Sequence, residues 1–93
     1  MTDSPIALVS GAAQGIGYGC AEALVEDGFK VILADIQDSV IDAAEKLGGV
    51  GYVCDFADSD AILKLFDAIE TEHGAVSALV NNAGIAMPGD FLS

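Results

Sequence analysis

Three glycines, Gly11, Gly15 and Gly17, follow an apolar run at residues 6–9, where a strand is expected to turn into a helix. The N–H groups at a helix N-terminus carry about half a positive charge, so they can hold a pyrophosphate without lysine or arginine. Gly11 permits a tight turn, Gly15 lets the backbone approach phosphates, and Gly17 lets the helix pack closely on a sheet. Glycine in a loop often marks only a turn, but the position between strand and helix favours phosphate binding here.

Asp35 ends the second apolar run, eighteen residues after Gly17. A carboxylate at that place accepts hydrogen bonds from the hydroxyls of an adenosine ribose, and it repels a 2′-phosphate. Ile36 and Gln37 supply no cation that would attract such a phosphate. The alternative interpretation is a surface acid that precedes a helix. The sequence therefore favours NAD over NADP as the cofactor.

Short apolar runs alternate along the chain with segments whose apolar residues recur at helical spacing. Short runs without polar alternation are typical of strands covered on both faces, whereas Ile62, Leu65 and Ile69 recur at the spacing of one helix face. We expect Asp38 and Asp58 to cap helices. Strands are predicted at residues 6–10, 31–34, 50–54 and 78–80, and helices at residues 15–27, 39–47 and 59–73.

The resulting pattern is βαβαβαβ. Strands joined by helix-length connections pair in parallel, and each crossover is right-handed. The predicted fold is therefore α/β, a partial Rossmann (doubly wound) parallel sheet with strand order 3-2-1-4, forming one dinucleotide-binding half over residues 1–93. In such a sheet the ligand lies beyond the carboxyl ends of the strands. The glycine-rich turn and Asp35 both belong to that edge.

Three motifs carry a family resemblance. Residues 10–17, SGAAQGIG, resemble the TGxxxGIG signature of classical short-chain dehydrogenases/reductases, and Ser10 keeps the hydroxyl of that signature. Residues 79–84, LVNNAG, match the family's NNAG motif, and residues 54–56 resemble its acidic position after the third strand. The resemblance implies an oxidoreductase that moves hydride between a nicotinamide and an alcohol or carbonyl group.

The resemblance also implies a set of cofactor-binding residues. Asp55 and the backbone of Phe56 are expected to hold the adenine, Asn82 and Gly84 to flank the riboses, and Asn81 to steady the sheet. The full set of expected contacts comprises Gly11, Gln14, Gly15, Ile16, Gly17, Asp35, Asp55, Phe56, Asn82, Ala83 and Gly84.

The family's proton-transfer residues have no counterpart in this sequence. They are a serine and a Tyr-x-x-x-Lys motif, in which the lysine lowers the tyrosine pKa. Tyr18 and Tyr52 both precede NNAG, and Glu22 and Phe56 stand four residues after them. We expect no catalytic residue here, and an inactive 93-residue chain on its own. The sequence favours a truncated dehydrogenase and leaves open a non-catalytic dinucleotide-binding module or a remnant that needs a partner chain.

The charge is strongly acidic, with 15 acidic residues, three lysines and a net charge of −12. A nucleic-acid surface needs a basic stripe, and attraction to an anionic membrane needs basic residues as well. The apolar runs fall far short of the roughly 20 residues that cross a bilayer, and the polar, acidic N-terminus does not resemble a secretion signal. We therefore expect no nucleic-acid or membrane partner and a cytoplasmic location.

Cysteine and histidine are too few and too scattered for a zinc site. Cys20 and Cys54 form no CxxC pair, and His73 is the one histidine in the sequence. Both cysteines are expected to be small buried apolar groups. His73 falls in the last turn of a predicted helix, where it is expected to cap carbonyl groups.

The fourth predicted strand, which runs into Asn81, is expected to have an open edge over residues 78–81. In the family's fold the fourth strand is interior, and this sequence contains no fifth strand. The strand has neither lysine nor proline, which are the usual protections of an exposed edge. We therefore expect self-association, or association with a partner chain, through this edge. A small alcohol or carbonyl substrate is expected only where the other half of the enzyme is supplied.

Overall fold

A four-stranded parallel sheet in the order β3-β2-β1-β4 organises the chain. This order confirms the predicted α/β fold. The structure is a computed structural model and describes residues 5–82. Its elements in chain order are β1 (Ile6–Ser10), α1 (Gly15–Glu26), β2 (Lys30–Asp35), α2 (Val40–Lys46), β3 (Val50–Val53), α3 (Ser59–Glu72) and β4 (Val76–Asn81).

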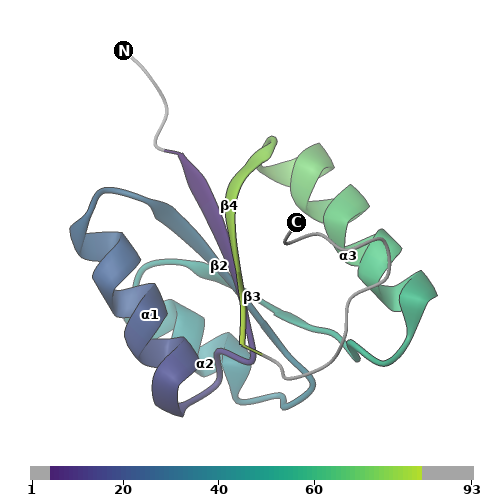
Figure 1. Ribbon diagram of the computed structural model, residues 1–93, viewed down its shortest axis with the longest axis horizontal. Helices are drawn as coiled ribbons and strands as arrows, with labels where there is room; N and C mark the ends of the chain where they lie inside the picture. Colours follow the sequence, from purple (N-terminus) through teal and green to yellow (C-terminus); the bar gives the residue numbers. More distant parts are fainter. Residues whose placement is uncertain (1–4, 83–93) are drawn as a thin grey trace.

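The sheet is covered on both faces, with α1 and α2 on one side and α3 on the other (Figure 1). Alternate residues of β1 pack against opposite sides of the sheet, because successive strand side chains point to opposite faces. Ala7 and Val9 belong to the core beneath α1 and α2, whereas Leu8 belongs to the core beneath α3. All five residues of β1 are therefore buried, which explains why the strand has no polar alternation.

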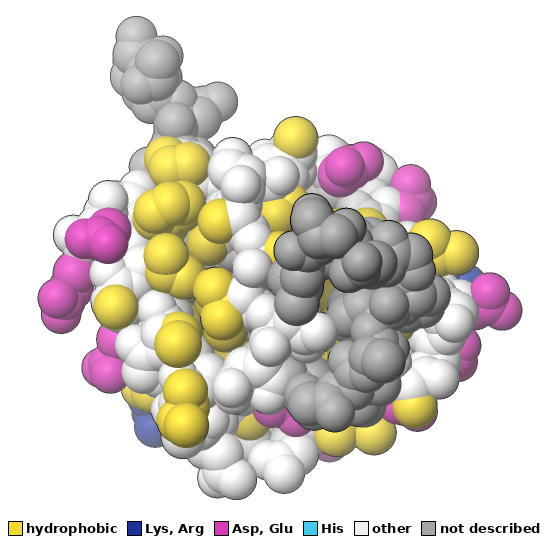
Figure 2. All heavy atoms as spheres, in the orientation of Figure 1, with side chains coloured by type: hydrophobic (Ala, Val, Ile, Leu, Met, Phe, Trp, Pro, Cys, Tyr) yellow, Lys and Arg dark blue, Asp and Glu magenta, His cyan; other side chains and the backbone are white. Residues whose placement is uncertain are grey.

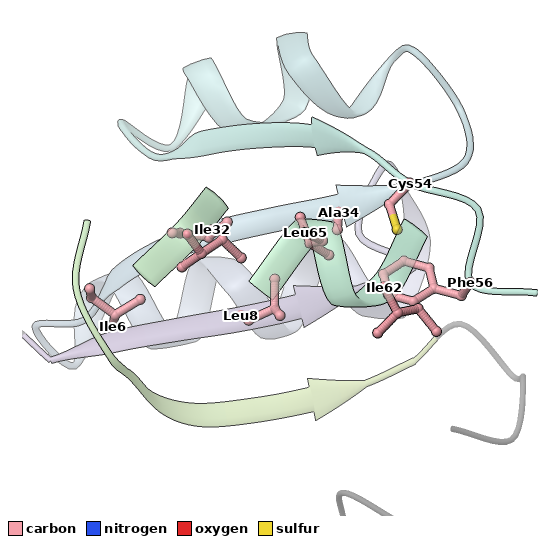
Figure 3. Packing of buried hydrophobic residues seen from close by; sticks show 9 residues of the cluster. Ile6, Leu8, Ile32, Ala34, Cys54, Phe56, Ile62 and Leu65 are labelled. Atoms are coloured by element: carbon pink, nitrogen blue, oxygen red, sulfur yellow. The ribbon is translucent and has the colours of Figure 1, made fainter. Parts of the chain in front are cut away.

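The core beneath α3 joins one helix face to the two central strands. Ile62, Leu65 and Ile69 of α3 are each 5% exposed or less, and they pack with Leu8 and Ile32 of the sheet (Figure 3). Their spacing in the sequence predicted this face. Burying side chains of this size stabilises the fold by about 1.5–3 kcal/mol each.

Asp58 caps α3 as predicted. Its Oδ1 accepts hydrogen bonds from the backbone N–H groups of Asp60 and Ala61, at 3.0 and 3.3 Å. Two of the N–H groups that a helix start leaves without carbonyl partners are satisfied in this way.

The prediction that Asp38 caps α2 is wrong. The N-cap residue is Ser39, which has helical backbone angles and makes no side-chain cap hydrogen bond. Backbone carbonyls take the place of the side-chain cap, because Val40 N–H donates to Gln37 O and Ile41 N–H donates to Asp38 O, both at 3.1 Å. The chain enters α2 through a tight turn that satisfies these donors.

β4 is longer than the sequence predicted. It begins at Val76, opposite Ile6 of β1, and the pairing is irregular between Ile6 and Ala7. Ser77 is exposed and interrupts the apolar run, so the sequence indicated a start only at Ala78. None of the helices within residues 5–82 combines the length and apolarity needed to cross a membrane.

Candidate functional site

The candidate site lies where the carboxyl ends of four parallel strands reach one edge of the sheet. The glycine-rich turn follows β1, Asp35 ends β2, and Asn82 follows β4. Because the strands are parallel, residues far apart in the sequence come together here. The structure links both Asp35 and Asn82 to the glycine-rich turn by hydrogen bonds.

The glycine-rich turn needs its glycines for two different reasons. Gly15 has φ +67°, a left-handed conformation that disfavours any side chain, and a Cβ there would meet nothing within 4 Å. Gly17 is the tight position, since its Cβ would lie 2.2 Å from Gly11 O and 2.9 Å from Asn82 Nδ2. The turn thus leaves open space above Gly15 and allows close packing at Gly17.

The first turn of α1 has no side-chain cap. Its N-cap residue, Gln14, is extended and makes no cap hydrogen bond, in contrast to Asp58 of α3. The first turn also contains no acidic residue, and Ile16 is 77% exposed. The N-terminus of α1 is therefore open to an anion, which its N–H groups and dipole favour.

Asp35 is fixed against the glycine-rich turn. Its Oδ2 accepts a hydrogen bond from Ala13 N–H at 3.0 Å, and its Oδ1 accepts one from Gln37 N–H at 3.1 Å. A carboxylate offers about four acceptor positions, so two backbone donors leave room for ligand hydroxyls. The contact with Ala13 was not predicted, because the two residues belong to different strand ends.

Ser10 joins the ends of β1 and β4. Its side chain is fully buried, its hydroxyl donates to Asn81 Oδ1 at 2.9 Å, and the same oxygen accepts from Asn82 N–H at 2.9 Å. Asn82 Nδ2 also donates to Gly11 O at 3.4 Å. The sequence indicated only that a hydroxyl belongs at this position and did not predict its partners.

Asp55 and Phe56 lie after β3 at the same edge of the sheet. Asp55 is exposed, and its Oδ1 accepts a hydrogen bond from Ala57 N–H at 2.9 Å. Phe56 is 5% exposed and its ring lies in the core near Ile62 (Figure 3), so the ring does not face a ligand. Cys54 N–H donates to Asp35 O at 2.9 Å, which holds the end of β3 beside Asp35.

Two of the predicted cofactor contacts, Ala83 and Gly84, lie outside the described residues.

Cys54 is a buried free thiol. Burial raises its pKa, and the charges of Asp55 and Asp58 raise it further. Within residues 5–82, no three His, Cys, Asp or Glu side chains form a group that could hold a metal ion.

The sequence profile of the short chain dehydrogenase family matches residues 5–93. The chain belongs to this family. Among its relatives is dehydrogenase/reductase SDR family member 11 of Gallus gallus, which is 40% identical over 96 residues. That match covers 95% of this chain and 38% of the relative. The chain therefore spans little more than a third of the relative's length.

Solved structures of similar proteins share the fold of this chain. The crystal structure of 2-keto-3-deoxy-D-gluconate dehydrogenase from Streptococcus agalactiae has a TM-score of 0.79 and 39% identity, covering 98% of this chain and 37% of the other. A structure described as ribose-5-phosphate isomerase from Brucella melitensis 16M has a TM-score of 0.84 and 32% identity, covering 95% and 36%. Members of this family generally use nicotinamide cofactors, and the chain corresponds to an N-terminal portion of the family's fold.

Proposed function

We propose that this chain is the NAD(H)-binding portion of an oxidoreductase that acts on an alcohol/carbonyl pair. The main support is the position of Asp35, whose carboxylate is held 3.0 Å from Ala13 N–H of the glycine-rich turn. A ribose bound beside that turn would meet a fixed carboxylate, which accepts hydroxyl hydrogen bonds and repels a 2′-phosphate.

The local geometry fits a dinucleotide. The uncapped N-terminus of α1 suits a pyrophosphate, Gly15 leaves the approach open, and the close contact at Gly17 keeps helix and turn together. Gly11, Gln14 and Ile16 complete the turn, while Asp55, the Phe56 backbone and Asn82 would hold the adenine and ribose parts. When bound, the nicotinamide supplies hydride transfer.

The charges near the turn also favour NAD. A groove of about 440 Å³ beside Gln14 and Gly15 contains one lysine, Lys46, and one acid, Asp42. The acid offsets the lysine, so the groove offers no net positive charge to a 2′-phosphate.

Titration of the chain with NAD and with NADP, followed by equilibrium dialysis, tests this proposal. We expect weak binding with a preference for NAD. Equal or tighter binding of NADP would contradict it.

The 93-residue chain is expected not to turn over simple alcohols or ketones, because its sequence contains no Tyr-x-x-x-Lys motif. Turnover that persists after host dehydrogenases are removed would contradict this expectation. A non-catalytic binding module that associates with a partner chain is the second candidate. Cofactor binding without turnover, also in the presence of the catalytic portion of a relative, would favour that candidate.

A further inference from the structure

Four polar side chains form a cluster at the amino-terminal edge of the sheet, opposite the candidate dinucleotide site. Lys30 is the first residue of β2, Tyr52 lies in β3, and Glu72 and His73 lie at the end of α3. Lys30, Glu72 and His73 also line an open cavity of about 890 Å³. The expectation that the His73 ring caps helix carbonyls is wrong, because both ring nitrogens face side chains of the cluster.

The hydrogen bonds of this cluster run in one direction. An ammonium group only donates, so Lys30 Nζ, 3.1 Å from His73 Nδ1, requires a lone pair on that nitrogen. The neutral ring then carries its hydrogen on Nε2, which lies 3.1 Å from the Tyr52 hydroxyl oxygen. The Tyr52 hydroxyl in turn donates to Glu72 Oε1 at 2.6 Å.

The state of Tyr52 agrees with this direction. Burial, then the hydrogen bond and charge of Glu72, raises the pKa of Tyr52 to about 12. The phenol therefore keeps its hydrogen and donates it to Glu72, which leaves the hydroxyl oxygen to accept from His73. The two rings pack edge to face, with centroids 6.3 Å apart and planes at 84°.

A second proton on the ring cannot be accommodated by the same arrangement. It would place N–H⁺ at Nδ1, facing the Lys30 ammonium at the present 3.1 Å. Two donors of like charge repel at that distance. Glu72 Oε1 lies 3.8 Å from Nε2 and offers the protonated ring an ion pair. Within residues 5–82, the titratable groups that face the ring nitrogens are Lys30 from β2, Tyr52 from β3 and Glu72 from α3.

We propose that His73 is a proton-operated switch that exchanges Lys30 for Glu72 as its partner. In the neutral state the ring ties the end of α3 to the start of β2, and in the protonated state it releases the Lys30 side chain into the cavity. The exchange needs no ligand, because an imidazole ring changes its own charge when it takes up a proton. It changes the charge presented by the cavity without involving the glycine-rich turn.

Nuclear magnetic resonance of the unmodified chain tests this switch with few ambiguities, because the sequence has one histidine and three lysines. The signals of the lysine ε-methylene groups and of the His73 ring are followed from pH 8 to pH 5. We expect the Lys30 signal to shift with the midpoint of the His73 ring, and the signals of the exposed Lys46 and Lys64 to stay constant. A constant Lys30 signal would overturn the proposal.

His73→Gln provides the matched variant, because it removes the titratable ring and keeps a polar side chain at the end of α3. The Lys30 signal is expected to become constant over the same pH range in this variant. An unchanged pH-dependent shift of Lys30 in His73→Gln would also overturn the proposal. The signals of Lys46 and Lys64 report in the same spectra whether the variant is folded as the parent chain is.

Discussion

The carboxylate of Asp35 lies 3.0 Å from the backbone N–H of Ala13, so the last residue of β2 holds the turn that follows β1. One side chain thus has two tasks at the candidate site. It fixes the conformation of the glycine-rich turn, and it presents acceptor oxygens to a ligand. A substitution that removes the negative charge of Asp35 but keeps a hydrogen-bond acceptor can distinguish the two tasks.

Asp35→Asn and Asp35→Ala are expected to differ in stability and to agree in cofactor preference. Both remove the negative charge, so both should narrow the difference in affinity between NAD and NADP. Hydrogen bonds to charged groups contribute about 1.5–3 kcal/mol, which corresponds to roughly a 10- to 160-fold loss of NAD affinity. Asn keeps an acceptor for Ala13 N–H, whereas Ala does not. The unfolding temperature of Asp35→Ala should therefore be lower than that of Asp35→Asn.

Asp67→Asn is the matched control for this comparison, because it removes the same charge from an exposed position on α3. Equilibrium dialysis with both cofactors and thermal unfolding provide the measurements. If Asp35→Asn leaves the ratio of NAD to NADP affinity as it is in the parent chain, the role of Asp35 in cofactor choice is refuted.

Gly17→Ala is expected to destabilise the chain and weaken dinucleotide binding. The added Cβ would lie 2.2 Å from Gly11 O, so the helix and the turn must separate. Overpacking of this kind costs about 1–3 kcal/mol, and each kcal/mol lowers the melting temperature of a domain of this size by about 4–8 °C. Thermal unfolding and equilibrium dialysis measure the two effects.

Gly19→Ala is the control in the same helix. A Cβ at Gly19 meets nothing within 4 Å, so the substitution should stabilise the chain by about 0.5–1 kcal/mol through helix propensity. Equal behaviour of the two variants would argue against the close contact at Gly17.

Tyr52 is expected to ionise near pH 12, above the ordinary value for a tyrosine. Because the folded pKa is raised, the contribution of Tyr52 to stability is complete below about pH 10 and is lost as the pH rises toward 12. Tyrosinate absorbance measures the ionisation, and Tyr52→Phe identifies which phenol is observed.

Glu72→Gln should lower the pKa of Tyr52 only in part, since burial is the largest cause of the shift. A Tyr52 midpoint near pH 10 would show that the phenol is neither buried nor bonded as the structure has it.

The outer edge of β4 is expected to pair with a second copy of this chain. Within residues 5–82, β4 has a strand neighbour on its β1 side only, and the strand Val76–Asn81 carries no charge. Hydrophobic side chains gather on the surface between α1 and β4, with acidic side chains farther out (Figure 2). Two copies, each strongly acidic, can therefore approach at an uncharged strand.

Ser77→Lys should shift this association toward the monomer, because a lysine on an edge strand disfavours pairing and Ser77 is exposed. Thr71→Lys adds the same charge at an exposed position on α3 and serves as the control. Sedimentation velocity at low micromolar concentration measures the change. A parent chain that sediments as a monomer, with the amides of residues 78–81 protected from hydrogen exchange, would show that another segment covers this edge.

Local signals in the sequence predicted the elements, whereas the contacts between elements could not be predicted in detail. Asp58 and the spacing of Ile62, Leu65 and Ile69 defined α3, because a cap and a helix face depend on residues within a few turns. At Asp38 the same reasoning was wrong, since backbone carbonyls competed successfully for the N–H groups of the first turn.

At the candidate site, the glycine spacing and Asp35 indicated a dinucleotide because parallel strands bring their carboxyl ends together. The contacts of Ser10 with Asn81 and Asn82 join residues 71 and 72 positions apart. No local pattern encodes such pairs. The cluster around His73 was missed for the same reason, because its members come from three separate elements.

The central place of β1 has a consequence for the order in which the chain can fold during synthesis. β1 leaves the ribosome before β2 and can pair with it early, but its other edge must wait for β4, whose Asn81 lies 71 positions after Ser10. Until then the nascent chain carries an apolar strand with one open edge, and the hydrogen bond from Ser10 to Asn81 cannot form. Transient open edges of this kind invite mispairing, so the interval between the synthesis of β2 and that of β4 is when the nascent chain most needs protection.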